Sequence, residues 1–170
     1  MAELSALAAR IAVLEDEALI RRVAARYMRL CDEPLVDDSD AAFADLFTQD
    51  VVWEGVGARA SQEFGRVEGR DALLAWFGSL RAPGTRHFLL NVHFLTSESI
   101  EVDGDRATGR WTMFQTALLG DEAGELRMAS LRIGFRRDGS AWRIAHFRTR
   151  SLCKAPIGVD AARLLAGGLA

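Results

Sequence analysis

One stretch combines the alternating pattern of a β-strand with side chains suited to catalysis or binding: Arg86-His87-Phe88-Leu89-Leu90-Asn91-Val92-His93-Phe94. Alternate side chains of an extended strand point to opposite faces, so one face should be apolar and the other should carry His87, Asn91 and His93. His87 and His93 are two of the chain's three histidines, and Asn91 is its only asparagine. We therefore expect a strand that packs on one side and presents a reactive polar surface on the other.

The composition is that of one globular domain. The 170 residues are 49% hydrophobic and 26% charged, and no linker, repeat or low-complexity tract divides them. A net charge of −3 and scattered arginines argue against nucleic-acid binding. No apolar run approaches the roughly 20 residues of a membrane-spanning helix, and the charged N-terminus lacks the features of a secretion signal. The sequence therefore predicts a cytoplasmic protein with no nucleic-acid or membrane partner.

The cysteines and histidines predict neither a disulfide nor a metal site. Cys31 and Cys153 are far apart and belong to no Cys-x-x-Cys pair, which favours reduced thiols. The three histidines form no cluster with the spacing of metal ligands, and no nicotinamide or flavin motif is present. We expect no metal and no cofactor.

The N-terminal region has the apolar spacing of helices. The first part carries a narrow apolar seam suited to packing against another helix, formed by Leu4, Leu7, Ile11 and Leu14. A second helical stretch follows from Asp16, a plausible N-cap, to Cys31. Whether the two stretches are continuous is left open by the sequence.

Pro34 disfavours helix in the residue before it and predicts that the second helical stretch stops there. This puts Asp32 at a helix C-terminus, where the peptide dipoles disfavour a carboxylate. Asp32 therefore needs a cationic or hydrogen-bonding partner.

The rest of the chain divides at turn signals. We expect a short helix at 41–47, a strand at 51–53, an irregular loop at 54–66 and a helix at 69–80. An antiparallel meander of four strands then starts with the quoted stretch and continues at 106–118, 127–136 and 142–150. Helices followed by such a meander predict an α+β fold, with a curved sheet wrapped around helices and a cavity between them. The apolar tail has a helical stretch at 159–165.

With these elements in place, the chain resembles the SnoaL-like branch of the nuclear transport factor 2-like superfamily, which includes scytalone dehydratase, bile acid 7α-dehydratase and hexachlorocyclohexane dehydrochlorinase. The resemblance is carried by Ile20-Arg21-Arg22, Arg26-Tyr27, Asp32, Leu46 to Trp53, Gly69 to Ala72, Arg86-His87 with Asn91, Val102 to Ala107, and Asp138-Gly139 before Trp142-Arg143-Ile144. It implies a cone-shaped α+β barrel in which a curved mixed or antiparallel sheet wraps the N-terminal helices. Residues 1–170 would form a single SnoaL-like domain, with a helical extension at 1–15 and a tail at 153–170.

The resemblance also implies a site. His87 falls where the dehydratases and the dehydrochlorinase place the catalytic histidine, Asp32 where they place its carboxylate partner, and Tyr27 where the dehydratases place a tyrosine. Because five residues on a regular helix put Tyr27 and Asp32 about 140° apart, the match requires the helix to end before Asp32. Substrate-binding positions would be Trp53, Asn91, Met113 and either or both of His146 and Arg148.

These residues suit a cofactor-independent lyase. A carboxylate beside His87 would fix its tautomer, raise its basicity and stabilise the imidazolium formed when it takes a proton from carbon. Tyr27 would assist the leaving group, which could be water, halide or a small carbon fragment such as formaldehyde. Leu89, Trp53, Met113 and Phe114 predict a largely apolar pocket for a small cyclic, aromatic or phenolic substrate, as in aromatic compound catabolism.

Two other functions fit the same residues. The chain could be a structural β-subunit of a ring-hydroxylating dioxygenase, which would not need the pair of Tyr27 and Asp32. It could also be an isomerase or cyclase, which would release no group. In each case the seam from Leu4 to Leu14 and the apolar tail favour a homo-oligomer, and the resemblance suggests a trimer or dimer.

Overall fold

The computed structural model describes residues 1–32, 39–80, 88–119 and 124–158. His87, the residues around Pro34 and the helical stretch expected at 159–165 lie outside this part of the chain. The described elements are α1 (Ala2–Asp32), α2 (Ser39–Ala44), β1 (Phe47–Gly55), α3 (Ala58–Phe64), β2 (Arg66–Glu68), α4 (Arg70–Leu80), β3 (Phe88–Asp103), β4 (Arg106–Leu119), β5 (Gly124–Asp138) and β6 (Ala141–Ile157).

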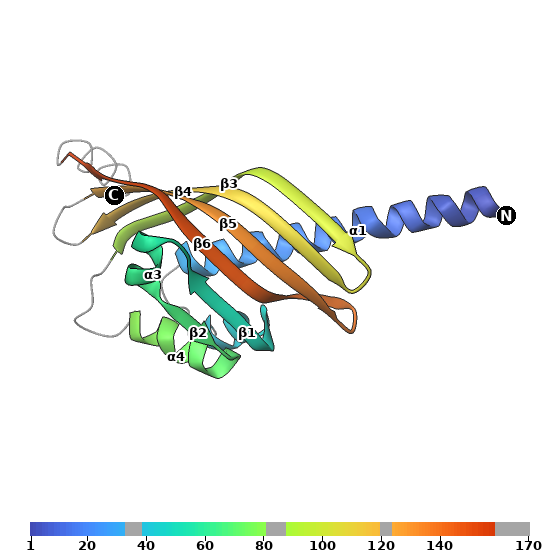
Figure 1. The fold of residues 1–170 in the computed structure, drawn as a ribbon, viewed down its shortest axis with the longest axis horizontal. Helices are drawn as coiled ribbons and strands as arrows, with labels where there is room; N and C mark the ends of the chain where they lie inside the picture. The colour runs from blue at the N-terminus through green and yellow to red at the C-terminus, as the bar shows by residue number, and fades with distance from the viewer. Residues whose placement is uncertain (33–38, 81–87, 120–123, 159–170) are drawn as a thin grey trace.

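The N-terminal region is one continuous helix, α1, which settles the question left open by the sequence. No glycine or proline interrupts residues 2–32, and alanine, leucine, arginine and glutamate dominate them, all strong helix formers. Burial begins near Ile20, so the first half of α1 projects from the body of the protein (Figure 1). Asp32 is the last residue of α1, one residue beyond the end that the resemblance required.

The sheet has six strands in the order β2-β1-β6-β5-β4-β3. Strands β3 to β6 form the predicted antiparallel meander, while β1 pairs with β6 in parallel and with β2 antiparallel. The sheet is therefore mixed, and it stays open at its β2 and β3 edges. It curves over the second half of α1, with α3 and α4 lying beside β1 (Figure 1). The predicted α+β fold with a curved sheet around N-terminal helices is confirmed.

Two segments differ from the sequence-based expectation. The region expected as an irregular loop, 54–66, contains the seven-residue helix α3 between Gly57 and Gly65, which have positive φ angles of 82° and 66°. Seven residues are too few to show a helical period, and the flanking glycines are typical of loops. In addition, β6 continues through Cys153 to Ile157, so the start of the tail belongs to the sheet.

The core lies between the concave face of the sheet and the helices. Ile20 and Ala24 of α1 are buried against it, together with residues of four strands that include Leu131, Ile133 and Ile144. Within the described ranges, no helix is both long and apolar enough to cross a membrane.

Candidate functional site

The C-terminal end of α1 contacts the middle of β3 through Asp32 and His93. Asp32 Oδ1 lies 2.5 Å from His93 Nδ1, and the backbone N–H of His93 donates to both carboxylate oxygens at 3.1 Å. The side chains are only 20% and 13% exposed. The partner that Asp32 needs at a helix C-terminus is therefore supplied by β3, and the two side chains form a carboxylate–imidazole pair.

Asn91, on the same strand, strengthens this junction. Its side-chain amide donates to the carbonyl oxygen of Cys31 at 3.0 Å, which satisfies one of the carbonyl groups left free at a helix end. The amide of Gln115 on β4 in turn donates to Asn91 Oδ1 at 2.6 Å. Asn91 thus holds the end of α1 against two strands and fixes the position of Asp32.

The register of the sheet connects His93 to a small cavity. His93 is opposite Gln115 on β4, Gln115 is opposite Arg127 on β5, and Arg127 is opposite Lys154 on β6. Residues directly opposite in a sheet share one face, so these four side chains form a row across the concave face. Gln115, Arg127 and Lys154 line a cavity of about 50 Å³. His93 therefore stands next to that cavity, one strand away.

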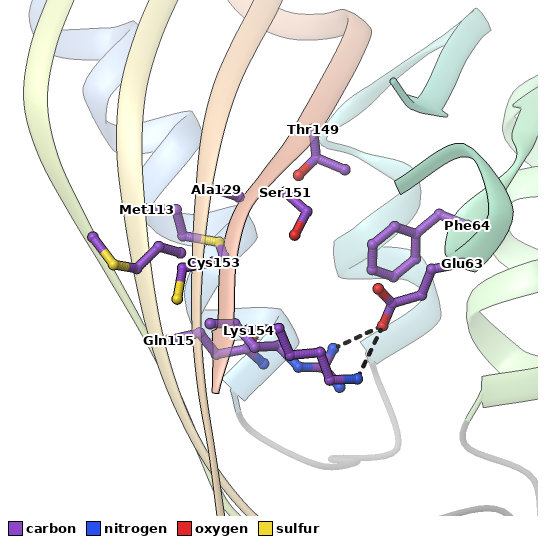
Figure 2. Close-up of a pocket in the computed structure, with 11 residues that line it drawn as sticks. Glu63, Phe64, Met113, Gln115, Ala129, Thr149, Ser151, Cys153 and Lys154 are labelled. Atoms are coloured by element: carbon purple, nitrogen blue, oxygen red, sulfur yellow. Dashed lines mark ion pairs between the residues drawn. The ribbon is translucent and has the colours of Figure 1, made fainter. Parts of the chain in front are cut away.

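The cavity is mixed in character (Figure 2). Its apolar lining includes Phe64 and Met113, and its polar lining includes Gln115, Thr149 and Ser151. Helix α3 covers one side, because Phe64 and the preceding residue, Glu63, both belong to it.

Ion pairs connect lining residues at one end of the cavity (Figure 2). Glu63 Oε1 lies 3.3 Å from Arg127 Nη1 and 3.8 Å from Lys154 Nζ. Arg127 also binds Glu125 through Nε and Nη2, at 2.9 and 2.6 Å. Glu63 thus ties α3 to strands β5 and β6.

Tyr27 and Trp53 lie together, away from the pair of Asp32 and His93. The indole N–H of Trp53 donates to the Tyr27 hydroxyl at 3.1 Å, and the two residues are 5% and 4% exposed. Burial raises the pKa of Tyr27 well above its ordinary value, and the neighbouring Cys31 side chain adds to this. Tyr27 is surrounded by Phe43, Phe47, Phe77 and Phe147. Tyr27 thus faces β1 and β6, whereas Asp32 faces β3, which is an edge strand of the sheet.

His146 and Arg148 lie on the outer face of the sheet, on the side of β1 and β6 opposite Trp53. Both bind Glu54 Oε1, at 2.8 and 2.6 Å, and Arg66 binds Glu54 Oε2 at 2.6 Å. Burial raises the pKa of Glu54, but the hydrogen bonds from Arg148, His146 and Arg66 outweigh it and hold the pKa at about 2. The structure does not bring His146 or Arg148 to the cavity.

A β-bulge explains this placement. Gly134 is opposite His146 and Phe135 is opposite Ile144, so β6 carries one extra residue at this point. Without it, His146 would share the inner face with Ile144; with it, Phe147 and Thr149 turn inward instead.

Of the residues predicted from the sequence, the structure brings Asp32 and Asn91 to the junction of α1 and β3 and Met113 to the cavity, and His87 lies outside the described residues. The pairing of Asp32 with His93 was missed, although His93 shares the polar face of the quoted stretch with Asn91. Glu63, Arg127 and Lys154 were also missed. Strand register brings Arg127 and Lys154 together, and Glu63 contacts them from α3, a helix that the sequence did not predict. Among the described side chains no metal-ligating group of three His, Cys, Asp or Glu residues occurs, so the prediction of no metal stays a prediction.

The sequence pattern of the SnoaL-like domain matches residues 12–148, which include the end of α1, strands β1 to β5, the first half of β6 and part of the cavity lining. The chain belongs to the SnoaL-like domain family. No curated protein matches it in sequence.

Solved structures share the SnoaL-like fold. A nuclear transport factor 2-like protein with a cystatin-like fold from Novosphingobium aromaticivorans is 29% identical, covering 95% of this chain and 96% of its own, with a TM-score of 0.64. The type-3 hexachlorocyclohexane dehydrochlorinase of Novosphingobium barchaimii is 16% identical, covering 88% and 94%, with a TM-score of 0.70. A Novosphingobium aromaticivorans protein provisionally named a scytalone dehydratase is 16% identical, covering 85% and 89%, with a TM-score of 0.69.

Proposed function

We propose that this SnoaL-like protein is a cofactor-independent lyase that eliminates a small group from a small cyclic or aromatic substrate. The observation that carries the proposal is the contact of Asp32 with His93, one strand from the cavity. Two similar structures are named as a dehydrochlorinase and, provisionally, as a scytalone dehydratase, and both names describe elimination reactions. The resemblance in the sequence supports the proposal independently, since it assigns Asp32 to the catalytic carboxylate.

The geometry defines how the pair would work. With His93 Nδ1–H donating to Asp32, the free nitrogen of the ring is Nε2, which can accept a proton. His93 Nε2 takes the proton from a substrate carbon, and the electrons of that C–H bond form a double bond to the neighbouring carbon. The leaving group departs from the neighbouring carbon with its bonding pair. The proton on His93 then passes to the departing hydroxide or to solvent, which restores the base.

Asp32 would hold the ring and offset the positive charge that His93 gains in the transition state. Two further bonds keep this carboxylate in place, because the His93 backbone N–H reaches both of its oxygens. Asp32 is thus preorganised by backbone as well as by side chain, as a charge-stabilising group should be.

The resemblance assigns the base to His87, which shares the quoted stretch with His93 and would also use Asp32. We propose His93 as the base because its ring contacts Asp32, and we treat His87 as the competing candidate for this role. The two assignments are separated by mutating each histidine to glutamine, which keeps a polar side chain of similar size but accepts no proton.

The experiment measures product mass and turnover for a panel of cyclic alcohols and cyclic halides that carry a hydrogen on the carbon next to the leaving group. His93→Gln and Asp32→Asn are expected to lower kcat by about 10²- to 10⁴-fold with little change in KM, since a general base acts in the chemical step. His146→Gln is the matched control and should leave turnover unchanged, because His146 binds Glu54 on the outer face. Full activity of His93→Gln, with loss in His87→Gln, would move the base to His87.

The alternatives give different outcomes in the same assay. A product of the same mass as its substrate would identify an isomerase or cyclase. Copurification with a larger iron–sulfur protein, and no turnover that depends on either histidine, would identify the dioxygenase subunit.

A further inference from the structure

We propose that the substrate carries a carboxylate, that Arg127 binds this carboxylate, and that Glu63 occupies the same place when no substrate is present. This inference rests on the proposed function, because it places the substrate in the cavity beside His93. It adds the chemical class of the substrate and the way in which the cavity opens.

The first argument is position. Arg127 is two strands from His93 in the cross-strand row, with Gln115 between them. Neighbouring strands are about 4.8 Å apart, so the Cα atoms of His93 and Arg127 are separated by about 10 Å. A single ring can bridge this span when its reacting carbon faces His93 and a carboxylate at its other end faces Arg127. The amide of Gln115 lies along the path between them.

The second argument is the difference between the two carboxylates that Arg127 binds. Glu125 takes Nε and Nη2 at 2.9 and 2.6 Å, and its side chain is only 13% exposed. Glu63 takes Nη1 at the longer distance of 3.3 Å, and its contact with Lys154 Nζ is longer still, at 3.8 Å. Glu63 is therefore the partner that another carboxylate can replace, whereas Glu125 keeps the guanidinium in position.

The third argument is charge. Arg127 and Lys154 are faced by Glu63 and Glu125, so this end of the cavity is neutral without substrate. A carboxylate that replaces Glu63 keeps the cluster neutral. A neutral substituent that displaced Glu63 would leave Arg127 and Lys154 with one carboxylate between them, which is unfavourable because these two side chains are only 20% and 35% exposed.

The fourth argument is volume. The cavity of about 50 Å³ is smaller than the roughly 300 Å³ at which small-molecule sites begin, so α3 has to move away before a ring can enter. The bonds of Glu63 to Arg127 and Lys154 hold α3 in place, and α3 is flanked by Gly57 and Gly65, whose positive φ angles suit hinge positions. The substrate carboxylate thus removes the ion pairs that tie α3 to β5 and β6, while the hydrogen bond from Ser61 to the carbonyl oxygen of Gly55 keeps α3 attached to β1.

The test measures binding by calorimetry, with benzoate as the anionic probe and benzamide as its neutral counterpart. Wild type is expected to bind benzoate at least tenfold more tightly than benzamide. Glu63→Gln should tighten benzoate binding about five- to tenfold, because the competing charge is gone, and should change benzamide binding much less. Glu101→Gln, which removes a carboxylate that is 70% exposed, is the matched control and should change neither.

Arg127→Gln should abolish the preference for benzoate. Because this change also removes the bonds between Arg127 and Glu125, its thermal unfolding is recorded alongside, and Glu63→Gln decides the question if the variant does not fold. Equal binding of benzoate and benzamide to wild type, or no gain for benzoate in Glu63→Gln, would overturn the inference. Binding requires no turnover, so failure here leaves the His93 mechanism standing, and failure of that mechanism leaves this result valid.

Discussion

The indole N–H of Trp53 donates to the hydroxyl oxygen of Tyr27 at 3.1 Å, inside a cluster of aromatic rings. The rings of Trp53 and Phe147 stack with an interplanar angle of 4° and centroids 5.5 Å apart. This hydrogen bond satisfies the only polar atom of the indole. It makes Tyr27 a structural partner of Trp53, whatever part it has in catalysis.

Tyr27→Phe should lower the free energy of unfolding by about 1–3 kcal/mol, because it leaves the buried Trp53 N–H without an acceptor. Urea denaturation measures this loss. Trp53→Phe removes the donor instead, and in the double variant the two losses should not add, since the second change has no hydrogen bond left to break. Additive losses would show that the bond contributes little.

The same substitution tests the catalytic role proposed for Tyr27. Burial raises the pKa of Tyr27, so its hydroxyl stays protonated at neutral pH and can donate a hydrogen bond to a leaving group while it accepts the one from Trp53. We expect Tyr27→Phe to lower kcat by less than about tenfold, far below the loss expected for His93→Gln. Equal losses would place Tyr27 at the reacting atoms.

Glu54 should make stability depend on pH in the acid range. Its pKa is about 2 in the folded protein, against an ordinary value of 4.5. A carboxyl with a lowered folded-state pKa stabilises the fold fully above its unfolded pKa and loses that effect as the pH falls from about 4.5 to about 2. The contribution should be about 1–2 kcal/mol, below the full shift, because Arg66 and Arg148 are partly exposed.

Urea denaturation between about pH 2.5 and about pH 7 measures this contribution. Glu54→Gln should flatten the dependence below about pH 4.5. Asp50 also has a pKa of about 2, but its side chain is 66% exposed, so Asp50→Asn should change the curve less.

Gly55→Ala should destabilise the protein because it pushes α3 away from β1. A Cβ atom at Gly55 would lie 2.1 Å from the carbonyl oxygen of Ala60, a backbone atom of α3. The expected loss is about 1–3 kcal/mol in unfolding free energy, measured in urea. Gly78→Ala in α4 is the control: its Cβ meets no atom within 4 Å, and alanine favours helix, so stability should stay equal or rise.

The apolar seam on the projecting part of α1 should mediate self-association. Leu4, Leu7, Ile11 and Leu14 are 46–68% exposed and follow the spacing of a coiled-coil seam. In a parallel pairing of two copies, Arg10 of one copy would lie beside Glu15 of the other, an attractive arrangement. Light scattering should give a dimer or trimer mass at micromolar concentration, and Leu7→Asp should reduce it to the monomer.

Val13→Asp provides the control for the seam. Val13 is similarly exposed, at 42%, but lies off the seam, so an aspartate there should leave the oligomer intact. A wild-type monomer, or equal dissociation of both variants, would contradict a specific role for the seam.

Periodicity predicted most elements of the fold because each is long enough to show its period. The meander and α4 followed from apolar alternation and helical spacing, whereas α3 did not, since seven residues between two glycines carry no readable pattern. The continuity of α1 follows from the absence of helix breakers, a signal present in the sequence but not decisive before the packing is known.

The site was harder to predict because it depends on register. Alternation indicates that His93 and Asn91 share a face, but not which residue of β3 meets the end of α1. The sequence does not indicate that Gln115, Arg127 and Lys154 are opposite one another, because this depends on the register of three strands. Likewise, His146 faces outward because of one extra residue in β6, and no local pattern marks that bulge.

The parallel pairing of β1 with β6 determines how the chain must fold. Phe47 pairs with Ile144, 97 residues later, whereas each hairpin from β3 to β6 joins strands that are adjacent in sequence. Loop-closure entropy makes such distant contacts slow to form, so the hairpins should fold first and β1 should dock last. During synthesis, the segment from β1 to α4 therefore waits for β6 to emerge, with the apolar side chains of β1 unprotected until then.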